Sequence, residues 1–239
     1  MKVFVAGASG VIGRPLVRLL VAAGHTVTGS TRSAERAASI EALGGRAVAV
    51  DVFDAVALSK EVAAAKPDVV INQLTDLPDA RDPAQIAASR AGNARIRIEG
   101  TRNLMVAARA AGATRAIAQS IAFVYAPGRA PLRETDPLDD SEAQRVTVEG
   151  VRALERATLE TPGITGLVLR YGRLYGPGTW FDAPGGPGPL TTDAAAQAAL
   201  LAVTRGAPGI YNIAEDDGTL SIDKACRELG FDPGFRMPA

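Results

Sequence analysis

The sequence predicts an α/β fold built on a doubly wound parallel sheet. Short apolar runs of strand type alternate along the chain with stretches of helical periodicity. The first run, residues 1–6, breaks at a glycine-rich turn and leads directly into an amphipathic helix that begins at Arg14. Alternating strands and helices of this size form a parallel sheet that helices cover on both faces.

The other elements follow from the same apolar patterns. Strands are expected at residues 26–29, 47–50, 69–71, 115–119, 165–169 and 210–213. Helices are expected at residues 33–43, 55–65, 83–111, 142–159, 194–203 and 221–229. Asp82 and Pro83 supply an N-cap and a first-turn proline for the longest helix, and Gly112 ends it. Residues 127–140 and 176–189, both rich in proline, are expected to be loops.

The turn after the first strand has the sequence G-x-x-G-x-x-G. Between a strand and a helix, such a turn is typical of the phosphate-binding start of a dinucleotide-binding, Rossmann-type fold. Gly7 permits the tight turn, Gly10 lets the backbone approach a pyrophosphate, and Gly13 lets the helix lie close to the strand. The pyrophosphate would lie on unpaired N–H groups at the helix N-terminus. The residues expected to contact it are Gly7, Ser9, Gly10, Val11, Ile12 and Gly13.

Composition excludes several classes of partner and site. The 239 residues carry 26 Lys and Arg against 26 Asp and Glu, so the net charge of zero favours neither nucleic acid nor an anionic membrane. The chain has one cysteine and one histidine, which excludes an internal disulfide and a multi-histidine metal site. No apolar run is long enough to span a membrane, and the chain starts with its first strand, so a cytoplasmic protein is expected.

The end of the second strand indicates which dinucleotide is bound. Sites for NAD usually place an acid there to bind the ribose 2′-hydroxyl. Residues 29–33 read Gly-Ser-Thr-Arg-Ser and contain no acid. Arg32 would instead contact a 2′-phosphate, with Ser33 as a neutral donor, so the sequence predicts NADP(H). Asp51 and Val52, after the third strand, are placed to meet the adenine edge. A plain surface role for Arg32 and a helix-capping role for Asp51 are the alternatives.

A set of motifs extends this pattern along the chain. Beside the glycine turn and Asp51-Val52 they are Glu99-Gly100-Thr101-Arg102-Asn103-Leu104, Ala118-Gln119-Ser120 with Tyr125, Leu169-Arg170-Tyr171, Leu174-Tyr175-Gly176-Pro177-Gly178 and Gly209-Ile210-Tyr211-Asn212-Ile213. With these motifs the chain resembles the extended short-chain dehydrogenase/reductase family, in its epimerase/dehydratase branch, over nearly its whole length.

The resemblance implies further site residues. The loop after the fourth strand, with Gln73, Leu74 and Thr75, would pass the cofactor ribose. Tyr171 and Tyr175 follow the sixth strand and would face the cofactor cleft. Ser120 falls at or beside the position of the family serine or threonine that hydrogen-bonds the reacting oxygen. Ser120 is therefore the polar candidate for that role.

The chain departs from that family in its acid–base residues. The family places a lysine four residues after a tyrosine, one helical turn away, so that the ammonium lowers the pKa of the tyrosine. Here no lysine lies between residues 67 and 223, and Thr147 and Val151 fall near the two positions. Arg97 replaces the family asparagine before Gly100. The standard proton relay is therefore absent.

Three tyrosines are candidates to replace the missing proton donor. Tyr125 follows Ser120 closely, and we predict Ser120 and Tyr125 as the catalytic residues. Tyr171, Tyr175 and an ordered water are the alternatives. A packing role is the other interpretation of Tyr125 and Tyr175.

The region after the sixth strand is short for the resembled family. We expect residues 1–170 to form the NADP-binding domain and residues 171–239 a reduced C-terminal substrate annex interleaved with the sheet. Residues 174–204 contain no lysine or arginine to bind a nucleotide diphosphate. Trp180 and Phe181 would instead form an apolar lid over the pocket.

These observations predict an NADPH-dependent oxidoreductase that reduces a small carbonyl-type substrate. One alternative is a catalytically silent NADP(H)-binding sensor or regulatory protein, because the proton relay is missing. A second alternative, by resemblance, is a sugar-nucleotide epimerase or dehydratase. The helices at residues 83–111 and 142–159 match the pair through which the resembled family commonly dimerises, so a homodimer is expected.

Overall fold

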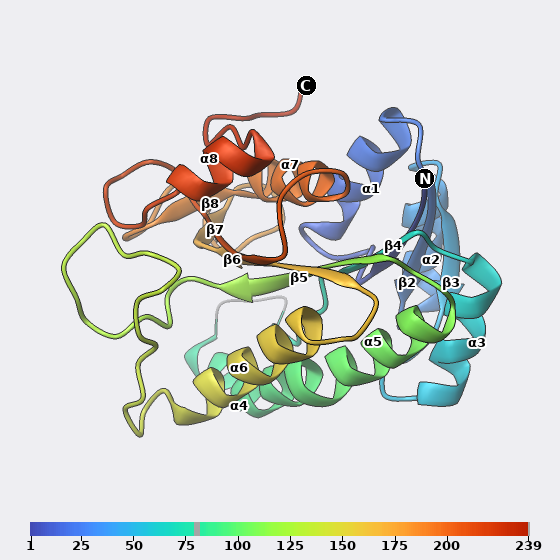
Figure 1. The fold of residues 1–239 in the computed structure, drawn as a ribbon, viewed down its shortest axis with the longest axis horizontal. Helices are drawn as coiled ribbons and strands as arrows, with labels where there is room; N and C mark the ends of the chain where they lie inside the picture. The colour runs from blue at the N-terminus through green and yellow to red at the C-terminus, as the bar shows by residue number, and fades with distance from the viewer. Residues whose placement is uncertain (79–81, 239) are drawn as a thin grey trace.

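Seven parallel strands form one sheet at the centre of the molecule (Figure 1). The computed structural model describes residues 1–78 and 82–238. The strand order is β3-β2-β1-β4-β5-β6-β9, which confirms the predicted doubly wound α/β class. The strands are β1 (Lys2–Ala6), β2 (Thr26–Thr31), β3 (Arg46–Ala49), β4 (Val69–Asn72), β5 (Arg115–Ile121), β6 (Thr165–Tyr171) and β9 (Gly209–Ile213).

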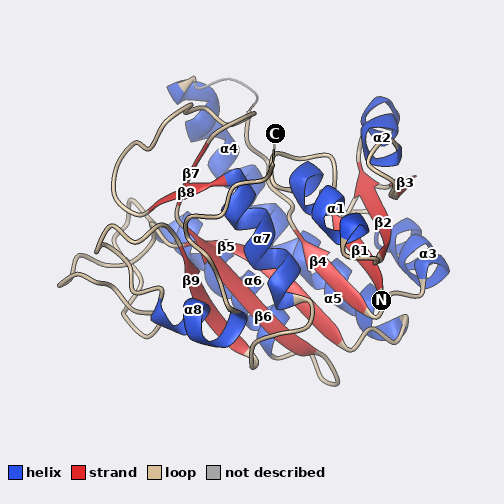
Figure 2. Cartoon of the chain, turned by 90° about the horizontal axis from the view of Figure 1, so that it is seen from above, coloured by secondary structure: helices blue, strands red, loops and turns tan. Residues whose placement is uncertain are grey.

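Helices cover both faces of this sheet (Figures 1 and 2). One face carries α1 (Gly13–Ala22), α7 (Thr192–Ala202) and α8 (Asp223–Leu229), and the other carries α3 (Ala55–Ala65), α5 (Thr101–Ala110) and α6 (Arg145–Leu159). The remaining α-helices are α2 (Ala34–Glu41), which packs on β2 and β3, and α4 (Pro83–Arg95), which packs on α6. Among the described helices, none is both long and apolar enough to cross a membrane.

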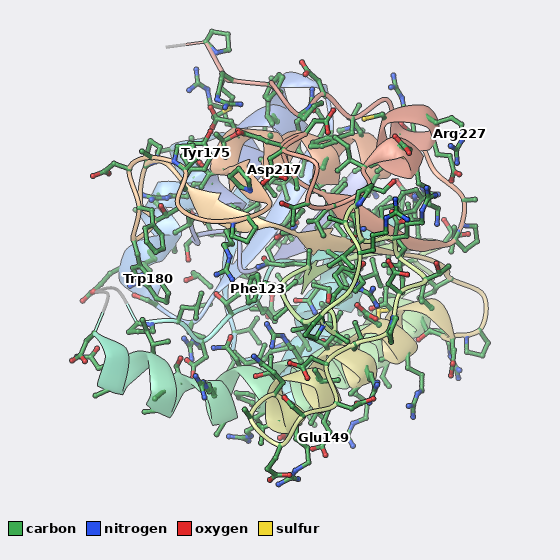
Figure 3. The ribbon with its side chains drawn as sticks, turned by 90° about the vertical axis from the view of Figure 1, so that its left-hand side faces the viewer. Phe123, Glu149, Tyr175, Trp180, Asp217 and Arg227 are labelled. Atoms are coloured by element: carbon green, nitrogen blue, oxygen red, sulfur yellow. The ribbon has the colours of Figure 1, made fainter. Side chains whose placement is uncertain are left out.

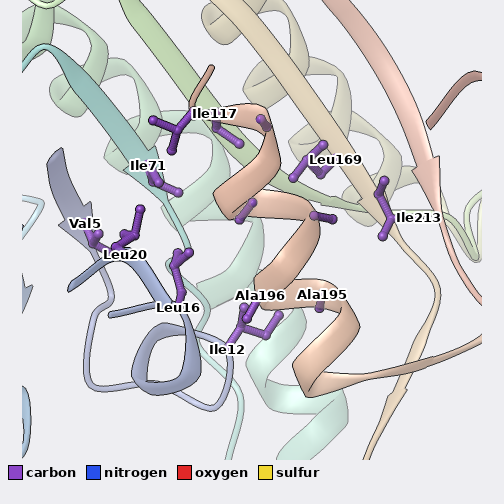
Figure 4. Close-up of a cluster of buried hydrophobic side chains, with 14 of the residues drawn as sticks. Val5, Ile12, Leu16, Leu20, Ile71, Ile117, Leu169, Ala195, Ala196 and Ile213 are labelled. Carbon is purple, nitrogen blue, oxygen red and sulfur yellow. The ribbon is translucent and has the colours of Figure 1, made fainter. Parts of the chain in front are cut away.

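The larger core lies between the sheet and helices α1 and α7 (Figure 4). Leu16 and Leu20 of α1 pack there beside Val5 and Ile71 of the neighbouring strands β1 and β4. Helix α7 contributes almost only alanines, all fully buried: Ala194, Ala195, Ala196, Ala198, Ala199 and Ala202. Such small side chains let a helix lie close to α1 and to the sheet, so an alanine-rich segment becomes core rather than surface.

The strand order reverses at β1. The chain adds β2 and β3 on one side of β1 and then continues with β4, β5, β6 and β9 on the other. In open α/β sheets, ligands bind outside the carboxyl ends of the strands at such a switch point. Gly7 after β1 and Gln73 after β4 stand on the two sides of this crevice.

Two features of the fold differ from the expected elements. The helix expected at residues 83–111 contains a π-helical segment, η1 (Ile96–Gly100), between α4 and α5. The expected loop at residues 176–189 is flanked by a second, two-stranded parallel sheet of β7 (Arg173–Tyr175) and β8 (Pro189–Thr191). Strands of three residues give no periodicity signal, and a single π-helical turn within a helix does not change the apolar pattern of the sequence.

Candidate cofactor and substrate site

The glycine turn forms a cradle at the start of α1. Gly7 has φ +82°, and a Cβ atom there would lie 2.8 Å from the backbone oxygen of Gln73. A Cβ atom at Gly13 would collide with the backbone oxygens of Gly7 and Ala8. No side chain caps the N-terminus of α1. Bare backbone and an uncapped helix start are what a pyrophosphate needs, so this turn fits a dinucleotide.

Gln73 adds a second observation that fits a ligand. Its Nε2 donates to the hydroxyl of Tyr171 across 3.2 Å, while its Oε1 is buried without a hydrogen-bond partner. In the described part of the chain, His25 Nδ1 is the other such side-chain atom. Buried acceptors normally have a donor, so a ligand that donates at this point would complete the site. Leu74 and Thr75, predicted with Gln73, follow in the same loop, where the Leu74 N–H donates to Asn72.

The residues predicted for the adenosine half lie after β2 and β3. Arg32 is exposed, and its Nη2 lies 3.6 Å from Oδ1 of Asp76. Ser33 caps α2 by accepting the N–H of Arg36, and the Ser9 hydroxyl donates to Thr31. Arg32 therefore provides an exposed cation with a loosely held partner at the position where the sequence predicts a 2′-phosphate. The preference for NADP(H) stays a prediction.

Asp51 does not cap the next helix. Asp54 is the N-cap of α3 and accepts the N–H of Ala57, whereas Asp51 accepts the N–H of Phe53. The capping alternative for Asp51 is therefore wrong. Val52 is buried, and its carbonyl accepts from Asn103 across 3.0 Å.

A loop from the C-terminal region reaches both sides of the crevice. Trp180 Nε1 donates to the carbonyl of Pro78 across 3.1 Å, beyond the end of β4. A Cβ atom at Gly178 would lie 3.3 Å from the guanidinium of Arg14 on α1. The segment around Trp180, labelled in Figure 3, therefore spans from the β4 loop to the glycine turn. This position is compatible with the predicted lid.

Ser120 and Tyr125 lie at two ends of one buried polar network. The Ser120 hydroxyl donates to Oε1 of Glu155 across 2.9 Å. Arg170 donates to both oxygens of Glu155, each across 2.8 Å, and also to the Tyr125 hydroxyl across 2.8 Å. Tyr125 donates in turn to Oδ1 of Asn212 across 2.6 Å.

Strand register builds this network. Ser120, Arg170 and Asn212 are register neighbours on β5, β6 and β9. Exposed fractions of 1% for Ser120, 6% for Glu155 and 4% for Arg170 place the ion pair in the interior. Burial opposes the charge of Arg170, but the hydrogen bonds and attraction of Glu155 outweigh burial and raise the pKa of Arg170.

Every tyrosine hydroxyl of the chain has a hydrogen-bond acceptor. The acceptors are Asn212 for Tyr125, the Ala195 carbonyl for Tyr171, Glu215 for Tyr175, and both the Ala207 carbonyl and Glu228 for Tyr211. Burial is the largest cause that raises the pKa of all four tyrosines. Tyr171 is 1% exposed and points at α7, so it does not face an open cleft. Its role toward the cofactor stays a prediction.

A small cavity lies next to this network. Its volume is about 150 Å³, and its lining includes Phe123 and Tyr125 after β5, Gly172 and Arg173 after β6, and Leu220. The carboxyl ends of β5 and β6 therefore form its floor. In a doubly wound fold this position is beside the cofactor crevice.

Sequence reasoning missed three charged residues of this region. Glu155 and Arg170 carried a usable signal, because Glu155 follows Val151 by one helical turn on the apolar face and Arg170 interrupts an apolar strand. Arg173 carried none. Arg97 was noted only as a replacement; burial lowers its pKa to about 10, with Glu155 acting in the opposite direction.

Comparisons with known proteins agree with this geometry. Residues 3–204 match the family described as "NAD dependent epimerase/dehydratase family". The chain is 40% identical to a 3-diazoavenalumate denitrifying reductase of a Streptomyces species, over 100% of this chain and 85% of that protein. It is 33% identical to a dTDP-4-dehydrorhamnose reductase of Streptomyces griseus, over 73% of this chain and 50% of that protein.

A solved structure with the same fold is that of the UDP-glucose 4-epimerase of Thermotoga maritima. The TM-score is 0.80 at 18% identity, with 99% of this chain and 94% of that chain covered. At this identity the likeness concerns the fold, whereas the family match and the 40% identical reductase concern the sequence. The chain therefore belongs to the NAD dependent epimerase/dehydratase family.

Proposed function

We propose that this protein is an NADPH-dependent reductase that delivers a hydride to a small acceptor without a tyrosine–lysine proton relay. When bound, the reduced nicotinamide supplies the hydride. The residues of this chain hold the dinucleotide on the glycine turn and the acceptor at the carboxyl ends of β5 and β6.

The observation that carries the proposal is the state of the proton donors. All four tyrosine hydroxyls donate their hydrogen to acceptors within the protein, and no lysine lies between residues 67 and 223. Ser120 donates to Glu155. An acceptor that needs a proton from a tyrosine in the transition state would find none free, so an acceptor with little need for one suits this site best.

The 40% identical relative supports such an acceptor. Its name describes a reductase that acts on a diazo compound with loss of nitrogen. When an arenediazonium ion gains one hydride and loses dinitrogen, the neutral arene remains. The hydride provides the hydrogen and both electrons, the carbon–nitrogen bond breaks, and no net proton is required. We therefore propose an arenediazonium ion as the preferred acceptor class.

Carbonyl reduction is the second candidate. It is favoured by the relative named as a dTDP-4-dehydrorhamnose reductase. Reduction of a carbonyl adds a proton to the oxygen, and in this site water would have to supply it. We expect this reaction to be slower than hydride transfer to a cationic acceptor.

The choice of NADPH rests on the end of β2. Residues 29–33 contain no acid, and Arg32 is the cation at that position. A 2′-phosphate carries more charge than the single carboxylate of Asp76, which lies 3.6 Å from Arg32. The phosphate would therefore displace an exposed ion pair of low strength.

A matched pair of acceptors tests the proposal. 4-Carboxybenzenediazonium and 4-carboxybenzaldehyde have similar sizes, and each is incubated with the protein and NADPH deuterated at C4. Mass spectrometry should find deuterium in the benzoate formed from the diazonium ion, at a rate well above reactions without protein or with an unrelated protein. Deuterium only in the alcohol would favour the carbonyl candidate. No transfer above the controls to either acceptor would overturn the reductase and favour the sensor.

A further inference from the structure

The cavity beside the polar network has the size of one aromatic ring. Its volume is about 150 Å³, and a cavity of about 150 Å³ with apolar walls holds benzene in another protein. Ala122, Leu132, Pro187 and Leu220 supply apolar walls here. Tyr125 also lines the cavity, and its hydroxyl already donates its hydrogen to Asn212. The cavity therefore offers an aromatic ring mainly apolar surface.

Two side chains at the mouth of this cavity are unusual for a protein surface. Phe123 is 48% exposed, and the guanidinium carbon of Arg173 lies 5.3 Å from the centre of its ring. Arg173 is exposed, and among the residues that the structure describes its recorded side-chain contact is the Phe123 ring, with no carboxylate within ion-pair distance. Figure 3 shows Phe123 in the middle of this face, between helices α4 and α6 and the C-terminal segments. An aromatic ring and an unpaired guanidinium thus stand together at the entrance.

The neighbours of Arg173 leave its guanidinium open. The stem of Arg173 lies beside Gly186, where a Cβ atom would be in ordinary van der Waals contact, 3.4 Å from Cδ of Arg173. Asp217 accepts the N–H groups of Gly188 and Thr219, two residues that line the cavity, and also the hydroxyl of Thr219. Burial opposes the Asp217 charge, but these hydrogen bonds outweigh it and lower the pKa of that carboxyl. Asp217 therefore joins two rim loops, and Arg173 is left to an external anion.

We propose that this cavity binds an aromatic monocarboxylate, with the ring against Phe123 and the carboxylate on Arg173. A guanidinium binds a carboxylate through two parallel hydrogen bonds, which gives both affinity and orientation. The bound ring would lie at the carboxyl ends of β5 and β6, on the side of the reacting cofactor. This inference rests on the proposed function and names the substrate class of that site: aromatic acids rather than neutral arenes.

Benzoate and benzamide test the proposal, because they share a shape and differ in charge. Binding is measured by calorimetry on the protein saturated with NADP⁺, so that no turnover occurs. We expect benzoate to bind at least about tenfold more tightly than benzamide. Arg173→Gln should abolish this difference, and Arg173→Lys should restore part of it. Phe123→Leu should lower the affinities for benzoate and benzamide to a similar extent. Arg109→Gln, which removes an exposed arginine on α5, is the matched control and should change neither.

Two results would refute the proposed binding site. One is that benzoate and benzamide bind the unchanged protein with equal affinity; the other is that the Arg173→Gln variant still prefers benzoate. Undetectable binding of benzoate would do so as well. Because these measurements involve no hydride transfer, they are independent of the reductase test. If the protein binds acids through Arg173 but shows no turnover, the proposed binding pocket stands and the proposed reductase function is refuted. If acceptors with and without a carboxylate are reduced at the same rate, the reductase function stands and the proposed binding pocket is refuted.

Discussion

Ser120 on β5 donates its hydroxyl hydrogen to Glu155 on α6 across 2.9 Å, in the interior of the protein. The same carboxylate accepts hydrogen bonds from Nε and Nη2 of Arg170. The serine that the family resemblance marks for substrate contact thus has a structural partner here. A group that already donates its hydrogen cannot donate it to a substrate oxygen unless the network first rearranges.

The Glu155–Arg170 pair should dominate the stability of this region. We expect Glu155→Leu to lower the free energy of unfolding by about 3–5 kcal/mol, because Arg170 would remain buried without its partner. Urea denaturation followed by circular dichroism measures this change. The double variant Glu155→Leu/Arg170→Met removes both charges and should be clearly more stable than the single variant. A double variant as unstable as the single one would contradict this account.

Ser120→Ala separates the structural role of Ser120 from the predicted catalytic one. Loss of the hydroxyl leaves Glu155 one donor short, so we expect a loss of about 1–3 kcal/mol in the free energy of unfolding. Turnover per folded molecule should change only a few-fold. If kcat/KM instead falls about 100-fold while stability is unchanged, Ser120 polarises the substrate as the sequence predicts.

Tyr125→Phe tests the candidate proton donor. This change removes one hydroxyl and keeps the ring that lines the cavity. The hydroxyl donates to Asn212 and accepts from Arg170. We therefore expect its loss to lower the free energy of unfolding while turnover of the diazonium acceptor stays almost unchanged. Stopped-flow measurement of NADPH oxidation gives the rate. A loss of about 100-fold would identify Tyr125 as the replacement acid.

Local patterns in the sequence predict most of the scaffold and little of the site. The glycine turn and the strand–helix alternation are short-range signals, so the fold class, β1 and the start of α1 follow from them directly. The network depends on the register that sets Ser120 beside Arg170 and Asn212, which joins residues far apart in the chain. The Phe123–Arg173 contact likewise depends on how the loop after β5 meets strand β7. Residue types alone do not encode such distances.

The homodimer through α4 and α6 remains a proposal. On α6, the apolar residues Val148, Val151 and Leu154 are buried within the chain. The outer surface still carries Ile98 of η1, 45% exposed, and Val146 of α6, 43% exposed. We expect a dimer at micromolar concentration in sedimentation velocity and a monomer for Val146→Glu. Val56→Glu, at an 83% exposed site on α3, is the control and should remain dimeric. A monomeric parent protein would refute the interface.

Because Arg32 pairs with Asp76, substitutions of these two residues should change the preference for NADPH over NADH in opposite directions. Arg32→Ala should remove most of the preference for NADPH over NADH, which we expect to be about tenfold to a hundredfold in Kd, the worth of a charged hydrogen-bonded contact. Asp76→Asn should increase that preference, because it removes a negative charge whose Oδ1 lies 3.6 Å from Nη2 of Arg32. Trp180 is the only tryptophan of the chain, and its fluorescence should report binding of the reduced cofactors beneath its loop. Equal affinities of the parent protein for NADPH and NADH, or the same response to both substitutions, would exclude Arg32 as the residue that selects the phosphate.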